Sequence, residues 1–385
     1  MRTNVRFVGL CLAAFTLAVS AQDKPRARNL GVPFDGTPGP LNAITDVQGV
    51  EVGETTLISG SSIRTGVTAI LPRGKHNNDA VFAGWFSQNG DGEMTGTTWV
   101  EESGFLDGPV MITNTHSVGV VRDAVIAWQA KTGRLPKTNT YGTSFFSLPV
   151  VAETFDGRLN DVNGFHVKPE HVFAALENAH SGAISEGNHG GGTGMRCYGF
   201  KGGTGTASRK LDERSGGYTV GVLVQCNCGT RDQLMVAGVP VGREIPETSP
   251  RSALSPPRET EVGSIIIVIA TDAPLLPHQL KRLARRATMG LARTGSTSGN
   301  SSGDIFIAFS TANPDAARPA GVADLKMLPN NEMNGLFTAT AEATEEAVVN
   351  AMVGAETMTG ANNQTVVALP HDGLRQALKK YNRLQ

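Results

Sequence analysis

The feature that most constrains this chain is an unbroken apolar run over residues 265–270, Ile-Ile-Ile-Val-Ile-Ala, which follows Gly263 and Ser264. A run of this length, rich in β-branched side chains and flanked by turn residues, predicts a strand that is buried on both faces. Ser264 is then expected at the mouth of a rigid core strand, a position that suits a nucleophile.

Residues 244–262, just before this strand, are polar and interrupted by prolines. Such a composition cannot pack and predicts an exposed loop, where chains are most easily cut. A cut before Ser264 would give this serine a free α-amino group with a pKa of about 7.7 to 8.0, a base tied to the hydroxyl that it must activate. On these residues alone, a Gly-Ser pair that merely begins a strand is the commoner arrangement, and both interpretations stay open.

The charge balance of the chain argues against polyanionic partners. Its 34 basic and 35 acidic residues give a net charge of -1, so neither nucleic acid nor an anionic membrane surface is expected as a partner. The basic residues of segment 274–293 predict a solvated helix face, because no aromatic residues are interleaved with them. A small uncharged or zwitterionic ligand fits the composition better.

The amino terminus has the three parts of a secretory signal peptide. Arg2 and Arg6 form a positive region, residues 7–19 an apolar core, and residues 19–21 a small-residue cleavage site, Val-Ser-Ala. We therefore expect residues 1–21 to be removed and the protein to be periplasmic or secreted. No later run reaches the roughly 20 apolar residues of a spanning helix, so no membrane partner is expected.

Three cysteines follow the signal peptide: Cys197, Cys226 and Cys228. An odd number cannot make a complete disulfide framework and leaves at least one thiol outside it. A zinc site is not expected, because the one-residue spacing of Cys226 and Cys228 is too short and no ligand-spaced histidine pair accompanies them. Strand alternation predicts both of these sulfurs on one face, as core thiols.

Strands and helices are expected along the whole mature chain without a clean βαβ rhythm. Apolar segments predict buried strands at residues 67–71, 109–113, 220–225 and 305–309. Amphipathic segments predict helices over residues 117–132, 168–179, 274–293 and 342–359. Asp272 is expected to cap the third helix, with Pro274 in its first turn. The pattern predicts an α/β (α+β) fold of packed sheets covered by helices, in a single domain over residues 22–385.

The glycine-rich stretch 187–209 is the obvious candidate for a phosphate-binding loop, but its details do not fit. Lys201 is followed by Gly202 rather than by serine or threonine, and no strand precedes the stretch as a dinucleotide fingerprint requires. Two interpretations stay open: a wall of the active site, or a loop whose glycines let it pack close to another backbone.

Several long motifs in one order resemble those of the L-aminopeptidase D-amidase/D-esterases (the DmpA type) and the β-peptidyl aminopeptidases. They include Thr-Asn-Thr-His-Ser-Val-Gly at residues 113–119, Leu-Pro-Val-Val-Ala-Glu-Thr at residues 148–154, segment 44–53, the glycine-rich stretch, and Gly263-Ser264 with its strand. The resemblance implies a four-layer αββα sandwich of the DmpA and ornithine acetyltransferase type, similar to N-terminal nucleophile hydrolases. It also implies a precursor that cuts itself into chains 22–263 and 264–385.

The same resemblance implies one cleavage site and four catalytic residues. Ser264 matches the nucleophile, which would first attack the carbonyl carbon of Gly263 and later that of the substrate. Ser302 and Asp304 match a Ser-Gly-acid motif that assists proton transfer, and Asp304 is also a candidate to receive the free amino group of the substrate. Asn227 matches an asparagine whose side-chain amide helps to form the oxyanion hole, a contribution of about 3 kcal/mol to the barrier.

Glu153 and Phe155 are placed in the substrate pocket. Phe155 departs from the family pattern, in which relatives often carry tyrosine, and a phenyl ring has no hydroxyl to donate, which puts a catalytic role of this side chain in doubt. Glu54 is a second departure, at a position where histidine is more usual, and we assign no function to it.

The sequence therefore predicts an exported, self-processing serine aminopeptidase or amidase that acts on short peptides, amides or esters without a metal or organic cofactor. The resemblance further implies an oligomer of processed heterodimers. Two alternatives are an acyltransferase of the ornithine acetyltransferase type, which uses a threonine nucleophile, and a periplasmic ligand-binding protein that never processes itself. The preference among L-α, D-α and β-amino acids stays open, because it depends on pocket shape rather than residue type.

Overall fold

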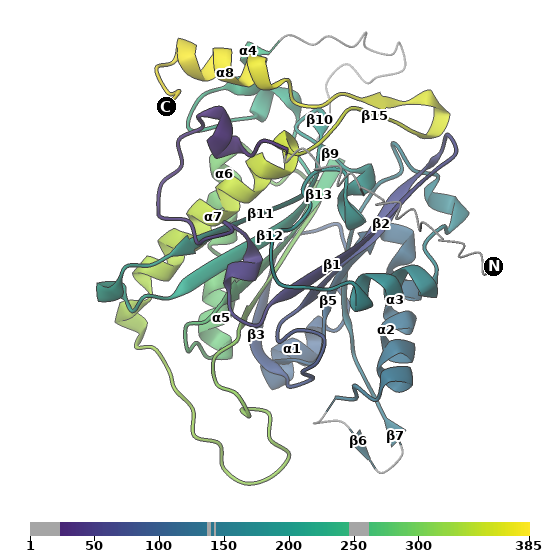
Figure 1. The fold of residues 1–385 in the computed structure, drawn as a ribbon, viewed down its shortest axis with the longest axis vertical. Helices are drawn as coiled ribbons and strands as arrows, with labels where there is room; N and C mark the ends of the chain where they lie inside the picture. Colours follow the sequence, from purple (N-terminus) through teal and green to yellow (C-terminus); the bar gives the residue numbers. More distant parts are fainter. Residues whose placement is uncertain (1–23, 137–139, 142–143, 246–261) are drawn as a thin grey trace, which may run out of the picture.

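Two β-sheets lie face to face between two layers of helices in the computed structural model of this chain (Figure 1). The structure describes residues 24–136, 140–141, 144–245 and 262–385. The predicted signal peptide and nearly all of the predicted processing loop lie outside these residues.

The first sheet has four strands in the order β1-β2-β5-β8. Its strands are β1 (Glu51–Ser59), β2 (Ile63–Leu71), β5 (Val110–Asn114) and β8 (Val150–Thr154). Helices α2 (Val118–Thr132) and α3 (Pro169–Glu177) pack on its outer face, and both lie within the segments for which the sequence predicts helices.

The second sheet has six strands in the order β11-β12-β13-β14-β3-β4. Its strands are β11 (Gly203–Lys210), β12 (Thr219–Asn227), β13 (Val262–Thr271), β14 (Ser301–Ser310), β3 (Val81–Gly90) and β4 (Phe105–Leu106). Its outer face is covered by α5 (Pro277–Ala284), α6 (Ala287–Arg293) and α7 (Asn334–Val353).

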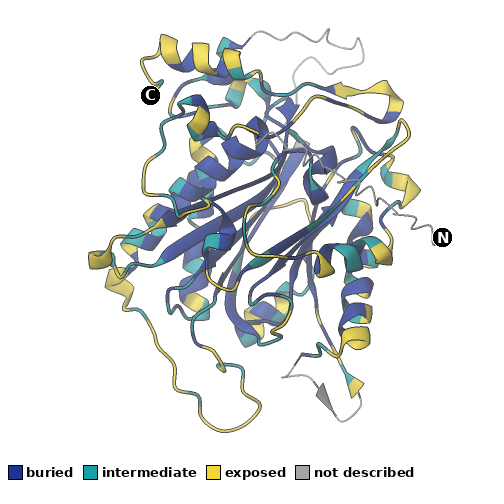
Figure 2. Ribbon diagram, viewed as in Figure 1, coloured by how far each residue is buried: buried dark blue, intermediate teal, exposed yellow. Residues whose placement is uncertain are grey.

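Three layers of buried apolar side chains hold these four layers together, and most strands of both sheets are buried, with β1 and the second half of β3 more exposed (Figure 2). One layer fills the space between the first sheet and α2 and α3, one lies between the two sheets, and one lies between the second sheet and α5 to α7. The predicted four-layer αββα sandwich is therefore confirmed.

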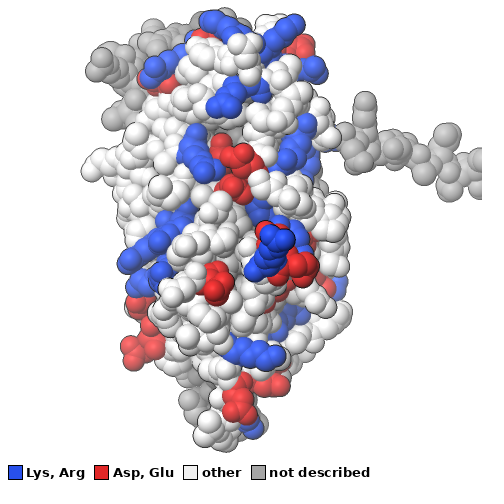
Figure 3. Space-filling view, turned by 90° about the vertical axis from the view of Figure 1, so that its left-hand side faces the viewer, with Lys and Arg blue, Asp and Glu red and all other residues white. Residues whose placement is uncertain are grey.

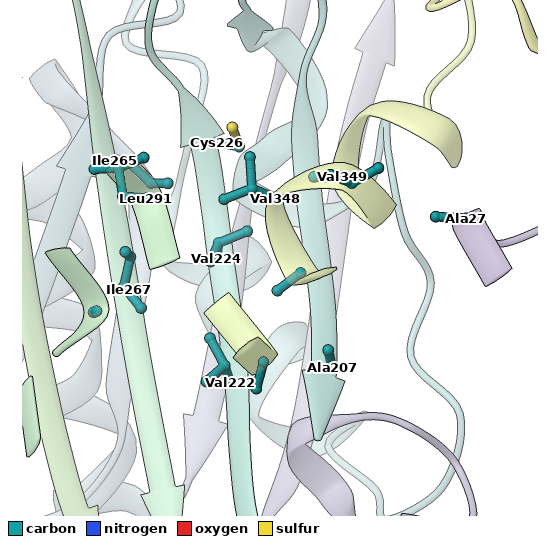
Figure 4. Close-up of a cluster of buried hydrophobic side chains, with 14 of the residues drawn as sticks. Ala27, Ala207, Val222, Val224, Cys226, Ile265, Ile267, Leu291, Val348 and Val349 are labelled. Carbon is teal, nitrogen blue, oxygen red and sulfur yellow. The ribbon is translucent and has the colours of Figure 1, made fainter. Parts of the chain in front are cut away.

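Strand β13 shows why the apolar run is unbroken. Ile265, Ile267 and Ile269 point to the helical layer, where Ile265 and Ile267 lie near Leu291 (Figure 4). Ile266 and Val268 point the other way, into the layer between the sheets. Because side chains of a strand alternate between its two faces, a strand buried on both faces requires an apolar residue at every position.

Smaller elements complete the chain. They are α1 (Thr97–Ser103), α4 (Val241–Glu244), α8 (His371–Lys380) and the short strand pairs β6 (Thr140–Tyr141) with β7 (Ser144–Phe145), β9 (Arg196–Cys197) with β10 (Phe200–Lys201), and β15 (Met358–Thr359) with β16 (Thr365–Val366). Among the described residues, none of the helices has the length and apolar character needed to cross a bilayer.

The prediction of one helix over residues 274–293 was wrong in two respects. The segment forms two helices, and the first begins only at Pro277. Asp272 is not its cap, because β13 extends to Thr271 and the Asp272 carboxylate accepts the N–H of Thr219 on β12 at 2.7 Å. Helix α7 likewise begins eight residues before the predicted start of the fourth helix and ends at Val353.

The basic residues of segment 281–293 do not form a simply solvated face. The guanidinium carbon of Arg285 lies 5.3 Å from the centre of the Phe86 ring, and that of Arg286 lies 4.1 Å from the centre of the Phe337 ring. Arg293 Nη1 pairs with Glu345 at 3.1 Å. On the side of the molecule shown in Figure 3, acidic and basic side chains are intermixed.

Candidate active site

Ser264 lies between two strands that bring polar groups to the same end of the second sheet. In the β-ladder it is paired with Asn227, the last residue of the antiparallel strand β12, and with Gly303 near the start of the parallel strand β14. Its Oγ accepts the N–H of Gly303 at 3.3 Å, and only 5% of the residue is exposed. The strand begins two residues before Ser264, which confirms the prediction that this serine lies at the start of a core strand.

Ser302 and Asp304 lie beside Ser264 on the neighbouring strand. Ser302 Oγ donates to Asp304 Oδ1 at 2.6 Å, and both residues are fully buried. The parallel register pairs Ser302 with Gly263, so the Ser-Gly-acid motif runs alongside the predicted cleavage site. Strand pairing alone thus brings all four predicted catalytic residues to the same end of the second sheet.

Asn227, the fourth, is held by two backbone groups. Its Oδ1 accepts the N–H of Arg196 at 2.8 Å, and its Nδ2 donates to the carbonyl oxygen of Phe155 at 3.0 Å. These contacts fix the orientation of the amide. Because an amide nitrogen carries two hydrogens, Nδ2 can still donate one hydrogen bond.

Gly263 packs so tightly that a side chain would not fit. A Cβ atom built on it would lie 2.3 Å from the carbonyl oxygen of Asn227 and 2.9 Å from Cys228 Cα. The requirement for glycine immediately before Ser264 therefore follows from the close approach of β12.

Glu153, on β8 of the first sheet, carries a second buried carboxylate, which faces the strand of Ser302 across Gly92. Its Oε1 accepts the N–H of Glu93 at 3.0 Å, and its Oε2 accepts the hydroxyl of Thr115. A Cβ built on Gly92 would lie 3.3 Å from Glu153 Oε1 and 2.9 Å from Gly303 Cα, so Gly92 is the spacer between this carboxylate and the strand of Ser302. Burial raises the pKa of Glu153, and the hydrogen bonds from Thr115 and Glu93 oppose this shift.

Phe155 contacts the site through its backbone rather than its ring. Its carbonyl oxygen accepts from Asn227, while 48% of the residue is exposed. The ring lies over Gly157, where an added Cβ would come within 2.2 Å of Phe155 Cζ. The structure therefore places this side chain at the surface, over Gly157.

Taken together, these groups form the set needed for acyl transfer from a serine. Ser264 lies on the strand between the one that carries the Ser302-Asp304 pair and the one that carries Asn227 with its fixed amide. These are the types of group that acyl transfer from a serine uses as nucleophile, proton carrier and oxyanion donor.

Known proteins share both the sequence and the fold of this chain. Residues 42–366 match peptidase family S58, and the chain is 52% identical to the β-peptidyl aminopeptidase BapA of Sphingosinicella microcystinivorans, over 99% of this chain and 98% of that protein. This chain belongs to peptidase family S58. A second BapA, from Sphingosinicella xenopeptidilytica, is 50% identical over 92% of this chain and 91% of its own length.

Two solved structures support the S58 assignment. The L-aminopeptidase D-Ala-esterase/amidase of Ochrobactrum anthropi, a serine aminopeptidase with a variant of the Ntn hydrolase fold, has a TM-score of 0.86 and 49% identity, over 94% of this chain and 100% of its own. A β-aminopeptidase of Burkholderia sp. has a TM-score of 0.83 and 46% identity, over 92% of this chain and 99% of its own. The S58 chain is therefore a hydrolase, an aminopeptidase with an Ntn-type fold.

Glu54 is not part of the S58 site described above. It lies on β1 opposite Thr68, and its Oε1 would be 3.1 Å from a Cβ built on Gly190. Burial raises its pKa to about 8, and the charge of Glu186 adds to the shift. No contact in the structure assigns a function to this departure from the family pattern.

The glycine-rich stretch is mostly a packing element of the S58 fold, and its end reaches the site. Gly190–Gly194 forms a buried 3-10 helix between the two sheets, where Gly191 N–H donates to Thr68 Oγ1 at 3.1 Å. The chain then continues to Arg196, whose N–H holds Asn227. The packing interpretation is confirmed for Gly190–Gly194, and a role as a wall of the active site stays a prediction.

Lys201, within that stretch, predicts a pH dependence of stability. The residue is fully buried, and its Nζ donates to the carbonyl oxygens of Gly202 at 2.9 Å and Gly192 at 3.4 Å. Burial lowers its pKa to about 7 from an ordinary value of 10.5, with a smaller contribution from the charge of Lys24. At pH values between these two pKa values, the unfolded state binds more protons than the folded state. The free energy of unfolding therefore rises with pH in this range.

We therefore expect the melting temperature to rise more between about pH 7.5 and 9.5 with Lys201 present than in Lys201→Met. Both are compared in the Ser264→Ala background, which is expected to remain one chain, and exposed Lys379→Met is the matched control. Parallel pH curves for Lys201→Met and its parent would contradict this prediction.

Two of the cysteines, Cys226 and Cys228, flank Asn227 in the chain, and the third, Cys197, lies on β9. Cys197 and Cys226 form a disulfide, and Cys228 Sγ lies 3.8 Å from Cys197 Sγ and 3.9 Å from Cys226 Sγ. The prediction that one cysteine lies outside a disulfide is confirmed, but the prediction that Cys226 is a thiol was wrong, because β9 brings Cys197 alongside it. With two sulfurs bonded to each other, the three do not fit the ligand set of a metal ion.

Sequence reasoning missed the groups that orient the predicted residues. Arg196, Glu93 and Gly92 act through their backbone, which leaves no signal in a single sequence. Thr115 was within a motif quoted for the family resemblance, and its hydroxyl beside Glu153 was not anticipated.

Proposed function

We propose that this chain is an exported, self-processing serine aminopeptidase that releases N-terminal α- or β-amino acids from short peptides, amides or esters. The observation that carries the proposal is the placement of Ser264 at the start of a buried strand, between the fixed amide of Asn227 and the Ser302-Asp304 pair. In this proposal residues 22–385 form one domain that is cut into chains 22–263 and 264–385, and several such heterodimers assemble.

Self-cleavage would begin from the continuous strand that runs through Gly263 and Ser264. Ser264 Oγ attacks the Gly263 carbonyl carbon, the peptide C–N bond breaks, and an ester between the two residues replaces it. Water then hydrolyses the ester. The products are a carboxylate on Gly263 and a free α-amine on Ser264, and Ser302 with Asp304 assist the proton transfers.

Hydrolysis of a substrate repeats this chemistry at the new amino terminus. The α-amine of Ser264 accepts the Oγ proton, Oγ attacks the substrate carbonyl carbon, and Asn227 Nδ2 donates to the oxyanion. The leaving amine takes the proton and departs, and water hydrolyses the acyl-enzyme. No metal or organic cofactor enters any step.

Buried carboxylates would restrict the enzyme to substrates with a free amino group. Asp304 and Glu153 both lie within a short distance of Gly303, and a substrate ammonium ion would compensate the cost of burying their charge. Asp304 Oδ1 already accepts from Ser302, whereas Glu153 lies across Gly92 from that strand. The identities of 52% and 50% to two β-peptidyl aminopeptidases lead us to include β-amino acids among the proposed substrates.

Purified processed protein tests this proposal with matched p-nitroanilides. The substrates are L-Ala, D-Ala and β-homo-Ala p-nitroanilide, each with a free and with an acetylated amino group. We expect release of p-nitroaniline from at least one free-amine substrate and none from its acetylated form. Equal rates for the two forms would rule out an aminopeptidase.

Phe155 is expected to affect substrate binding more than the chemical step. Replacing this half-exposed ring in Phe155→Ala removes apolar surface at the residue whose carbonyl contacts Asn227, so KM for an apolar substrate should rise about threefold to tenfold, with kcat within about twofold. Steady-state kinetics with a β-homo-Phe p-nitroanilide measure this effect, with Leu325→Ala, a similarly exposed residue after the far end of β14, as the control. A large fall in kcat would instead give the position a catalytic role.

A further inference from the structure

The segment that carries Asn227 is fastened to the segment 196–198 at three consecutive positions. The N–H of Arg196 donates to Asn227 Oδ1 at 2.8 Å, Cys197 is bonded to Cys226, and the N–H of Tyr198 donates to the carbonyl oxygen of Cys228 at 2.7 Å. The Cα atoms of the two bonded cysteines are 5.9 Å apart, within the usual range for a disulfide.

The disulfide joins the immediate chain neighbours of the two groups that define the amide orientation. Cys197 follows Arg196, the donor, and Cys226 precedes Asn227, the acceptor. Strand β9 has only two residues, and it pairs with β10. Both bonded cysteines are completely buried, which leaves them little freedom to move.

We propose that the Cys197–Cys226 disulfide is a positioning element of the oxyanion hole, which keeps the Arg196 N–H against Asn227 Oδ1 and thereby aims Asn227 Nδ2 at the reacting carbonyl. This inference rests on the proposed role of Asn227 as oxyanion donor. A donor misplaced by a fraction of an ångström loses much of its effect on the transition state, whereas substrate binding depends on it less.

The same disulfide is expected to influence self-cleavage. Gly263 packs on the carbonyl oxygen of Asn227 and on Cys228 Cα. The residues that follow Cys226 in the chain therefore contact the residue whose carbonyl belongs to the predicted scissile bond. Loss of the disulfide should therefore slow both the processing of the precursor and the turnover of the mature enzyme.

Chemical reduction balances as a two-electron exchange with a dithiol. Dithiothreitol supplies two electrons and two protons, the Cys197–Cys226 bond becomes two thiols, and the reagent becomes its cyclic disulfide. In cysteine variants, Cys228 must also be replaced, because its sulfur lies within 4 Å of both partners and can pair with whichever one remains.

The test uses the full chain and three sets of variants. Cys228→Ala is the matched control, which keeps the disulfide. Cys197→Ala/Cys228→Ala and Cys226→Ala/Cys228→Ala remove it without leaving a cysteine pair behind. We expect kcat of both double variants to fall about tenfold from that of the control with KM within about twofold, a part of the roughly hundredfold or larger loss that removal of a whole donor causes.

A double-mutant cycle with Asn227→Ala separates positioning from general stability. If the disulfide acts through Asn227, its removal should cost nothing further in the Asn227→Ala background. An unchanged kcat in the double variants, or an equal loss in both backgrounds, would overturn the proposal. Should the double variants fail to fold, the Cys228→Ala enzyme assayed with and without dithiothreitol gives the same comparison.

The outcome can be told apart from a failure of the proposed function. That failure would show as wild-type protein that hydrolyses no free-amine substrate. In that case the rate of precursor cleavage, measured by mass spectrometry, replaces kcat as the quantity compared in the double-mutant cycle. An Asn227→Ala precursor that is cleaved at the wild-type rate would overturn the positioning role.

Discussion

Ser264→Ala is expected to yield a single uncleaved chain with no measurable aminopeptidase activity. The alanine has no Oγ to attack Gly263, so no new amino terminus forms, and no acyl-enzyme can form with a substrate. Loss of a serine nucleophile lowers kcat by a factor on the order of 10⁶. Intact-mass spectrometry should show the masses of chains 22–263 and 264–385 for the wild type and one mass for the variant.

Ser301→Ala is the matched control for this experiment. Ser301 lies at the start of β14, one residue before Ser302, and is paired with Val262 in the ladder. The Ser301→Ala variant should be cleaved into two chains and should hydrolyse substrate at the wild-type rate. Cleavage of Ser264→Ala at the same bond, or full activity of an uncut wild-type chain, would contradict the self-processing mechanism.

Asp304→Asn is expected to lower kcat by about 10² to 10³, since proton transfer by a positioned group contributes on that scale. The amide oxygen can still accept the hydrogen bond from Ser302 Oγ, so the local geometry should persist, while the negative charge that favours proton transfer is lost. Steady-state kinetics measure the effect, and the melting temperature should stay close to that of the wild type.

Asp107→Asn provides a control of the same chemistry at another place. Asp107 is also a buried carboxylate, and it accepts from Trp99 Nε1 at 3.3 Å beyond β4. Its substitution should leave kcat within about twofold. An Asp304→Asn enzyme with unchanged kcat would remove Asp304 from the proposed machinery.

The sequence predicted the part of the site that depends on strand pattern. A continuous apolar run can be accommodated only in a strand covered on both faces, so the burial of β13 and the position of Ser264 at its start were predictable. The roles of Ser302, Asp304 and Asn227 came only from the family resemblance. The structure adds that the pairing of β12, β13 and β14 is what brings these residues together.

What could not be predicted depends on contacts between distant segments. The strand end at Thr271 determines the partner of Asp272, and local propensity carries no information about that strand end. Three cysteines allow several pairings, and only the position of β9 selects Cys197 with Cys226. The carboxylate of Glu153 depends on the spacing set by Gly92, which belongs to another segment.

The strand order of the second sheet determines what a cut at Gly263 would do to the molecule as a whole. Strands β13 and β14 belong to the carboxyl-terminal product, and they lie between β12 on one side and β3 on the other, both from the amino-terminal product. Such products would be interleaved rather than adjacent, with hydrogen-bond ladders on both flanks of the shorter chain. The scission would therefore create a new chain end without creating a separable part.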